Sequence, residues 1–252
     1  MKKIDLKKWL LRSLIIAGGS SVVYVIWMLV TLPDPSEYKS KNPQTTALLE
    51  QRRQEARQKG IKLAVKQKWI PSSAVPEMLK KIIRISEDAN FYYHDGIDFE
   101  ELKESIRKNW DEGKFARGGS TITQQVAKNL YLSTTKSLFR KIREYLIARR
   151  MEKSLSKERI FYLYLNIIEF GHGIFGVESA AQYYFGKSGS DLNLEEMIRL
   201  TAVIPRPLSI RADGNSRWLM WRCCWIAEKL ILYQYIDEAT HAALKEQFCR
   251  NN

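Results

Sequence analysis

Glu87 is the first of the acidic side chains in this sequence that could carry out chemistry. Residues 76–90 are predicted to form a helix, because a proline suits its first turn and its apolar residues fall on one stripe. Glu87 follows Ile83 by four residues and so lies at the edge of that stripe, whereas Asp88 points elsewhere. Desolvation there would raise the pKa of Glu87, as a general base near neutral pH requires. A carboxylate satisfied by a nearby arginine or backbone amide is the structural alternative.

A glycine-rich loop followed by a capped helix forms the second candidate site. Residues 117–125 read RGGSTITQQ and are followed by Lys128 and Asn129. The glycines allow a ligand to approach the backbone closely, the hydroxyls can cap a helix, and Gln125 and Lys128 share one helix face. Exposed amides and a lysine suit an anionic, sugar-bearing ligand such as a pyrophosphate-linked saccharide. A capped surface helix without a ligand is the alternative.

A third cluster of charge begins a basic helix that continues to Arg150. Arg140 and Lys141 precede Glu144 by four and three residues, so all three side chains can converge on one side of that helix. By itself, this pattern is also typical of a solvated charged face with weak surface ion pairs.

Other kinds of site are not supported by the sequence. His94, His172 and His241 are isolated, and no pair of Cys or His residues has metal-ligand spacing. There is no phosphate-binding Walker loop, dinucleotide fingerprint or nucleophile elbow, so we expect no nucleotide or organic cofactor. Carboxylates therefore remain as the candidate catalytic groups.

These candidate residues must be positioned by helices. Helical periodicity dominates from Pro76 through Met197, with no alternating strand pattern, and predicts a mainly α domain. A second helical group over 215–249 is rich in Trp and Tyr, and packing is its expected role. Residues 46–60 are predicted to be a charged helix with little apolar face, which connects rather than contributes to the core.

An uncharged run over residues 13–32 precedes this domain and could span about 30 Å as a helix. Basic residues dominate its N-terminal flank, so the positive-inside rule places everything after it outside the cytoplasm. The run is longer than a usual signal-peptide core and lacks a clear cleavage site, which favours a retained anchor. The predicted organisation is a cytoplasmic tail (1–12), a transmembrane anchor (13–32), a linker and membrane-proximal segment (33–75) and a catalytic domain (76–252).

The net charge of +13 has no accompanying nucleic-acid signature, and the predicted topology separates the domain from the genome. An anionic membrane surface is the expected partner. Cys223 and Cys224 are adjacent and unsuited to pairing with each other. A bridge from Cys249 to one of them remains open, with ordinary buried thiols the favoured interpretation.

The order of the motifs is more informative than any single one. The motifs are EDANFYYHDG at 87–96, GSTITQQ at 119–125, Arg140-Lys141 with Glu144, Lys157 with YLN at 164–166, and TAVIPRP at 201–207. Together they resemble the glycosyltransferase domain of class A penicillin-binding proteins. The resemblance runs from about Asn42 to Pro207, and because no transpeptidase domain follows, the chain most resembles the monofunctional biosynthetic transglycosylases.

This resemblance implies a lysozyme-like helical head with a smaller membrane-associated jaw, preceded by one N-terminal transmembrane helix. It implies polymerisation of lipid II with release of undecaprenyl pyrophosphate, at the periplasmic face of a bacterial inner membrane. Glu87 matches the general base, and Glu144 matches a second acid that places the pyrophosphate or its metal, Mg or Mn. Implied partners are the growing glycan chain, membrane lipids and proteins of wall synthesis or division.

Further residues match substrate-binding positions of that family. They are Asp88, Phe91, His94, Gly119, Ser120, Thr121, Gln124, Gln125, Lys128, Asn129, Lys136, Arg140, Lys141 and Asn166. Asn166 matches a structural position within its motif. Phe161 and Tyr162 stand where the fourth motif usually has a leucine and an acid, and residues 209–212 lack the proline that often closes the fifth.

Two other functions are compatible with parts of this pattern. A lysozyme-like muramidase or lytic transglycosylase would share the fold and one catalytic glutamate. The cationic third motif argues against it, since cleavage leaves no pyrophosphate to neutralise. A non-catalytic scaffold of wall synthesis would not need the clustered acids and amides.

Overall fold

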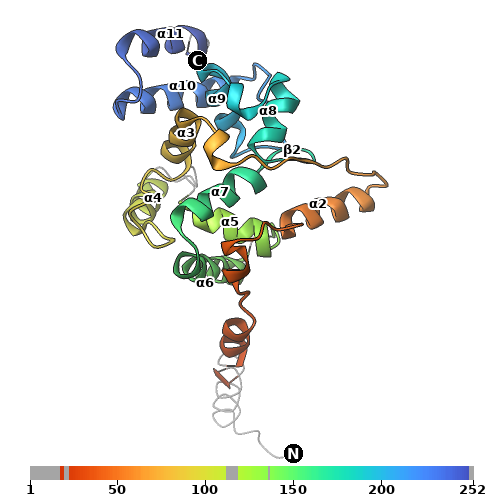
Figure 1. The fold of residues 1–252 in the computed structure, drawn as a ribbon. Helices are drawn as coiled ribbons and strands as arrows, with labels where there is room; N and C mark the ends of the chain where they lie inside the picture. The colour runs from red at the N-terminus through yellow and green to blue at the C-terminus, as the bar shows by residue number, and fades with distance from the viewer. Residues whose placement is uncertain (1–17, 20–22, 112–118, 136, 250–252) are drawn as a thin grey trace, which may run out of the picture.

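The computed structural model describes residues 18–19, 23–111, 119–135 and 137–249, and most of them are helical (Figure 1). The helices are α2 (Ala47–Gln58), α3 (Glu77–Glu87), α4 (Phe99–Asp111), α5 (Ile122–Tyr131), α6 (Leu138–Ser154), α7 (Lys157–Ile167), α8 (Val177–Phe185), α9 (Leu194–Val203), α10 (Arg217–Leu232) and α11 (Glu238–Phe248). Three short 3-10 helices are η1 (Pro35–Lys39), η2 (Ser72–Ala74) and η3 (Gly189–Asp191). The predicted mainly α class is confirmed.

A small sheet accompanies the helices, although no strand was expected. It contains β1 (Lys66–Gln67), β2 (Glu169–Gly171) and β3 (Ile174–Phe175) in the order β1-β3-β2. The β1–β3 pair is parallel and the β2–β3 pair is antiparallel. Each strand has two or three residues, which is too short for an alternating pattern to be read from the sequence.

The core forms around α7, which lies near the middle of the molecule in Figure 1. Its apolar residues are buried on almost every side, and Ile160, Leu163 and Tyr164 have no exposed surface. Helices α5 and α6 pack against α7, whereas α3, α9 and α10 pack against one another. Because an apolar stripe of each helix must be buried against a neighbour, this packing fixes the helix ends that carry the candidate site.

Helix α2 contributes to packing, contrary to the expectation of a simple connection. Its first turn buries Leu48 and Leu49 against Phe175 of β3. Farther along, the Nε of Arg52 donates to the buried Glu169 of β2 over 2.8 Å. A short apolar face, this ion pair and packing against α5 thus hold a helix whose sequence is mostly polar.

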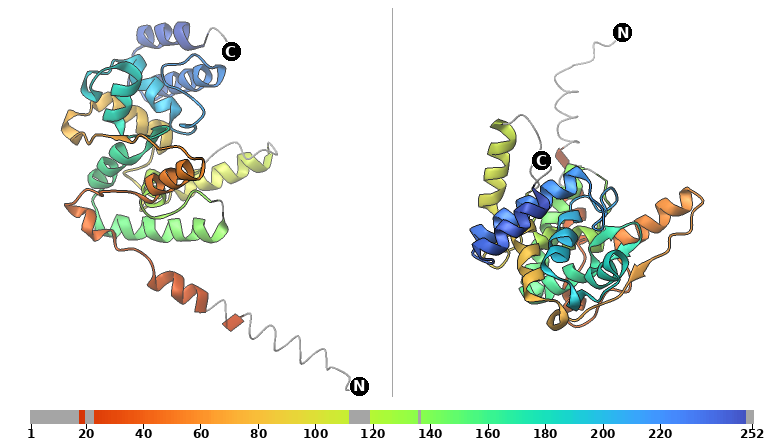
Figure 2. Two further views of the ribbon diagram at one scale, coloured as in Figure 1. Left: turned by 90° about the vertical axis from the view of Figure 1, so that its right-hand side faces the viewer. Right: turned by 90° about the horizontal axis from the view of Figure 1, so that it is seen from above.

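The N-terminal segment leaves the molecule beside α6, and α10 and α11 lie at the opposite end (Figures 1 and 2). Residues 23–30 are helical, and Arg150 of α6 donates to the carbonyl of Leu32 over 2.9 Å. Residues 13–17 and 20–22 of the predicted anchor lie outside the described part of the chain. Within the described part, no helix is both long enough and apolar enough to cross a bilayer.

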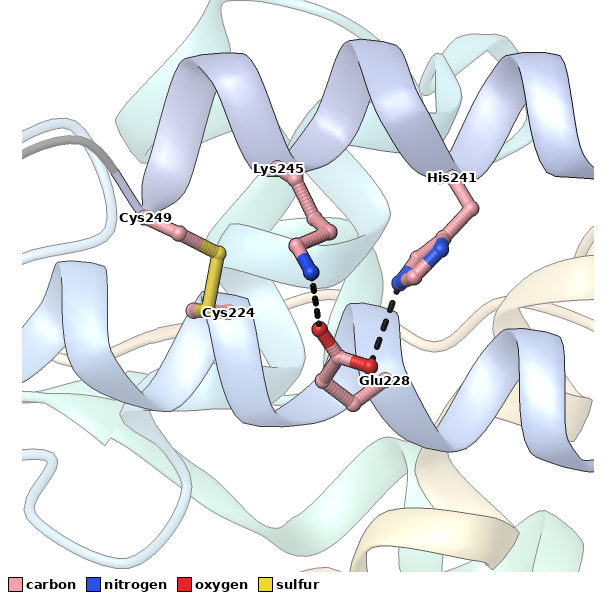
Figure 3. The surroundings of a disulfide bond; sticks show 5 residues. All are labelled: Cys224, Glu228, His241, Lys245 and Cys249. Atoms are coloured by element: carbon pink, nitrogen blue, oxygen red, sulfur yellow. Dashed lines mark ion pairs between the residues drawn. A yellow bond between two sulfur atoms is a disulfide. The ribbon is translucent and has the colours of Figure 1, made fainter.

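Helices α10 and α11 are joined by a disulfide between Cys224 and Cys249 (Figure 3). The favoured interpretation of ordinary thiols was therefore wrong for these two residues, because the antiparallel packing of the helices brings their Cα atoms to 5.5 Å. Beside the disulfide, Glu228 of α10 lies 3.3 Å from both His241 and Lys245 of α11. Cys223 remains a buried thiol, and burial raises its pKa to about 12.

We expect the Cys224→Ser/Cys249→Ser variant to lose about 3 kcal/mol of unfolding free energy, because the bridge closes a loop with a sequence separation of 25 residues. Thermal melting with and without a reducing agent measures this. The reductant should lower the Tm of the wild type and leave the double variant unchanged. Equal melting of both proteins under oxidising conditions would contradict the prediction.

Candidate active site

Glu87 is the last residue of α3, and the packing of that helix determines where its carboxylate lies. Leu79, Ile82 and Ile83 have no exposed surface and fix one face of α3 against the core. The predicted helix over 76–90 ends three residues early, at Glu87, because Asp88 adopts an extended backbone (φ −164°, ψ 80°). Glu87 therefore stands at a helix end, where its side chain can reach groups from other elements.

The carboxylate of Glu87 is only 11% exposed and meets two donors from distant parts of the chain. The Nε2 of Gln125, on α5, donates to its Oε2 over 3.1 Å, and an Nη2 of Arg222, on α10, lies 3.4 Å from its Oε1. Desolvation raises the pKa of Glu87, and the opposing effects of Arg222 and Gln125 do not cancel it. The raised pKa expected for Glu87 from the sequence is confirmed. The nearby arginine of the structural alternative is also present, as Arg222.

Gln125 is held in place by a buried tyrosine. The hydroxyl of Tyr164, on α7, donates to the Oε1 of Gln125 over 3.4 Å. This bond directs the amide Nε2 of Gln125 toward Glu87. The base is therefore oriented through a chain of contacts from α7 to α5 to α3.

Asp88 ties the end of α3 to the start of α5. Its Oδ2 accepts from the backbone N–H of Ile122 over 2.9 Å, and its Oδ1 lies 2.9 Å from the Nε2 of His94. Since the Nδ1 of His94 accepts from the N–H of Gly96, we assign the proton to Nε2, which then donates to Asp88. Asp88 and His94 thus have structural contacts, although both were expected among the substrate-binding residues.

The start of α5 is the capped helix that the sequence predicted. Thr121 and Gln124 form a capping box, and the hydroxyl of Thr121 donates to the carbonyl of Gly96 over 2.8 Å. Ser120 accepts from the Nζ of Lys141 over 2.8 Å, and Gln124 also lies within reach of that lysine. Gly119 and Ser120 are partly exposed, whereas residues 117 and 118 of the same loop lie outside the described residues.

Glu144 is a buried carboxylate between two cations. It is 2% exposed, its Oε2 accepts from Arg140 over 2.6 Å, and its Oε1 accepts from Lys141. The convergence of these three residues is confirmed, and burial of Glu144 excludes a merely solvated charged face. Because Lys141 also donates to Ser120, the third motif is physically joined to the second.

Lys128 lies between the two acidic centres. It is half-buried on α5. Its positive charge is near enough to the carboxylates of Glu87 and Glu144 to interact with both. Desolvation lowers its pKa, and its ammonium group makes no hydrogen bond or ion pair with another described residue. A partly desolvated cation without a direct partner is suited to receive an anionic group of a ligand.

Some residues expected at the site have other roles. Phe91 has no exposed surface and packs against Phe161, and Asn166 is also fully buried. The Oδ1 of Asn166 accepts from the N–H of Ile70 over 2.8 Å, which ties α7 to the preceding segment. Both side chains are closed to solvent in this structure, so a direct contact of either with substrate stays a prediction. Asn129 is also buried at 6% exposure, and Lys136 lies outside the described residues.

A groove of about 630 Å³ opens beside Glu87 and contains residues that sequence reasoning missed. Its walls come from α3, the loop before α5, the turn after α9, and α10. The lining residues from α10 are Trp218, Trp221, Arg222, Trp225 and Lys229. These residues recur at helical spacing, which was the available signal, but the sequence could not show that this stripe faces Glu87.

Comparison with known proteins agrees with this geometry. Residues 53–231 match the family model described as Transglycosylase. The chain belongs to the transglycosylase family. It is 37% identical to the biosynthetic peptidoglycan transglycosylase of Nitrosospira multiformis, over 84% of this chain and 91% of that protein. It is 41% identical to the protein of the same name from Dechloromonas aromatica, over 80% of this chain and 86% of that one.

The acids of this transglycosylase do not by themselves form a metal site. Both carboxylate oxygens of Glu144 accept from cations. Across the described ranges, no group of three His, Cys, Asp or Glu side chains is placed to hold a metal ion. The described residues alone therefore do not supply the ligand set of a resident divalent metal.

We expect Arg222→Gln to raise the pKa of Glu87 further, because it removes the main charge that favours the carboxylate. A general base works only when deprotonated, so the acid-side fall in transglycosylase rate should move to higher pH. The rate–pH profile measures this shift. Arg222→Lys, which keeps a cation, is the matched control, and an acid limb that stays in place for Arg222→Gln would refute the assignment.

Proposed function

We propose that this protein is a peptidoglycan glycosyltransferase that polymerises lipid II into glycan strands and releases undecaprenyl pyrophosphate. The observation that carries the proposal is the position of Glu87, a carboxylate of raised pKa at the wall of a large groove. The cluster of Arg140 and Lys141 around Glu144 supports the same reaction. Membership of the transglycosylase family and the names of the relatives are consistent with it.

In the proposed reaction, Glu87 removes the proton from the sugar 4-hydroxyl of the incoming lipid II. That oxygen forms a bond to the anomeric carbon of the growing chain as the bond from that carbon to the pyrophosphate breaks. Attack from the face opposite the leaving group inverts the anomeric carbon. The proton remains on Glu87 until it is lost to solvent, and undecaprenyl pyrophosphate leaves with the bonding electron pair.

The cationic side chains would stabilise the leaving group. Lys128, Arg140 and Lys141 would attract the pyrophosphate and stabilise the negative charge that grows on it in the transition state. Glu144 holds Arg140 and Lys141 at fixed positions, so their charges are directed before the substrate arrives. The expected divalent metal, Mg or Mn, would have to arrive with the pyrophosphate, and it stays a prediction.

The finer architecture is part of this proposal. We place residues 1–12 in the cytoplasm, residues 13–32 in the bacterial inner membrane and the catalytic domain in the periplasm. The uncharged run and its basic flank support that topology. A lysozyme-like head and a membrane-associated jaw are expected, with α6 beside the membrane because the N-terminal segment leaves there (Figure 2). Proteins of wall synthesis or division would be partners of the anchored enzyme.

We expect Glu87→Gln to lower polymerisation by about 10²–10⁴-fold while the protein stays folded, since it removes the base at nearly constant side-chain size. The measurement is incubation of detergent-solubilised protein with labelled lipid II and divalent metal, followed by gel separation with and without muramidase. Glu228→Gln, at a half-exposed position outside the groove lining, is the matched control. Wild-type rates for Glu87→Gln would refute the mechanism, and cleavage of preformed glycan without polymerisation would favour a lytic enzyme.

Lys128→Ala should reduce kcat/KM for lipid II on the order of 10²-fold, with little change in Tm, because the lysine ammonium pairs with none of the residues that the structure describes. Steady-state kinetics and thermal melting of the same preparation test both parts. Lys62→Ala, at an exposed position away from the groove, should match the wild type. An unaltered Michaelis constant and turnover for Lys128→Ala would contradict the role given to the lysine.

A further inference from the structure

Helix α10 has one buried face and one face that lines the groove beside Glu87. Leu219, Cys223, Ile226, Ala227 and Leu230 are buried with no exposed surface. The other stripe holds Trp218, Trp221, Arg222, Trp225 and Lys229, which line the groove together with Tyr233 just past the helix end. We call this second stripe the tryptophan face. Trp225 also packs against the core, whereas Trp218 and Trp221 are not part of that packing and need another explanation.

The rings of the tryptophan face are held in position and remain partly accessible. Trp221 is 47% exposed, and its ring centroid lies 6.3 Å from that of Trp218. The guanidinium of Arg206 lies 4.9 Å from the centre of the Trp218 ring, and that of Arg222 lies 4.1 Å from the centre of the Trp225 ring. These cation–π contacts restrict ring movement before any ligand is present.

The composition of the groove fits a saccharide. Its volume of about 630 Å³ lies within the range of small-ligand sites, roughly 300–1,000 Å³. Pyranose rings present flat C–H faces that pack on aromatic rings, while their hydroxyls bond to charged and amide side chains at the ring edges. The groove supplies both kinds of group, since Asn90, Asp98 and Arg206 line it together with the tryptophans.

The order of groups along the site indicates which sugar would lie there. Gln125 of α5, the helix that carries Lys128, donates to Oε2 of Glu87, whereas Arg222 of the tryptophan face lies beside Oε1, so the two helices approach different oxygens of the base. In a lipid-linked donor, the anomeric carbon stands between the pyrophosphate and the remaining sugar units. A donor with its pyrophosphate at the cations and its anomeric carbon near Glu87 therefore extends its chain toward α10.

We propose that the tryptophan face of α10 is a subsite for the sugar units of the growing glycan strand. This inference rests on the function proposed above and adds a specificity-determining surface to it. A bilayer is a poor alternative occupant, because α10 lies at the end of the molecule opposite the N-terminal segment (Figure 1). By holding several sugars after each addition, the subsite keeps the strand bound for the next one.

The first test compares the strand lengths made by Trp221→Ala and Trp218→Ala/Trp221→Ala with those of the wild type. Loss of the stacking surface should shorten the strands and raise KM for a lipid-linked oligosaccharide donor by about tenfold, with a smaller effect on coupling of two lipid II molecules. Tyr93→Ala removes an aromatic ring that is 89% exposed and does not line the groove. It should leave strand length unchanged, and Tm values should be similar for all variants. Wild-type strand length and KM in the double variant would overturn the inference.

The second test is independent of catalysis. Lipid-free glycan fragments, prepared by muramidase digestion, are titrated into the wild type and the same variants while binding is measured by calorimetry. Weaker binding, by about tenfold, for Trp221→Ala but not for Tyr93→Ala would support the subsite even if the wild type made no polymer, in which case the proposed function alone would fail. Equal fragment binding by the wild type and the double variant, or none by either, would overturn the subsite.

Discussion

Burial of the Glu87 carboxylate is the constraint on which the rest of the site depends. An ionised carboxylate removed from water loses hydration free energy unless nearby donors and cations replace it. Here the replacement is partial, because one amide and one rather distant guanidinium face the group and its pKa remains raised. Those two donors come from α5 and α10, so the base has its properties only when three helices meet correctly. A shift of α10 alone would leave Glu87 with a higher pKa and less charge at neutral pH.

The negative charges of Glu87 and Glu144 are compensated to different degrees by neighbouring cations. Glu144 has a cation on each oxygen, whereas Glu87 has a single ion pair at 3.4 Å. A carboxylate closely paired on both sides is suited to hold cations in place, and one that is incompletely compensated is suited to take up a proton. Lys128 stands between these environments and belongs directly to neither. The local electrostatics therefore suit Glu144 to position cations and Glu87 to transfer a proton.

Several buried contacts that support the site keep these two environments apart. Asp88 joins α3 to α5, and Asn166 joins α7 to the segment at Ile70. Removing one partner of such buried hydrogen bonds leaves the other unsatisfied, which typically costs about 1–3 kcal/mol. This explains why residues within the recognisable motifs can be structural: Phe91 and Asn166 support the site without facing it. The disulfide between α10 and α11 adds a covalent constraint at the end of the molecule that carries Arg222.

The sequence by itself determined the helical class, the capped start of α5, the convergence of Arg140 and Lys141 on Glu144, and the position of Glu87 at the edge of an apolar stripe. Each of these depends on residues within about four positions of one another, where helix geometry alone sets the distances. Tertiary structure decided the three short strands, the Cys224–Cys249 bridge, the packing of α2, and the approach of Arg222 and the tryptophans of α10 to Glu87. Residues 87 and 222 are separated by 135 positions, and no local periodicity specifies which face of α10 meets α3. That choice is made by burial of the opposite face of α10 in the core, because only one orientation removes its apolar side chains from water.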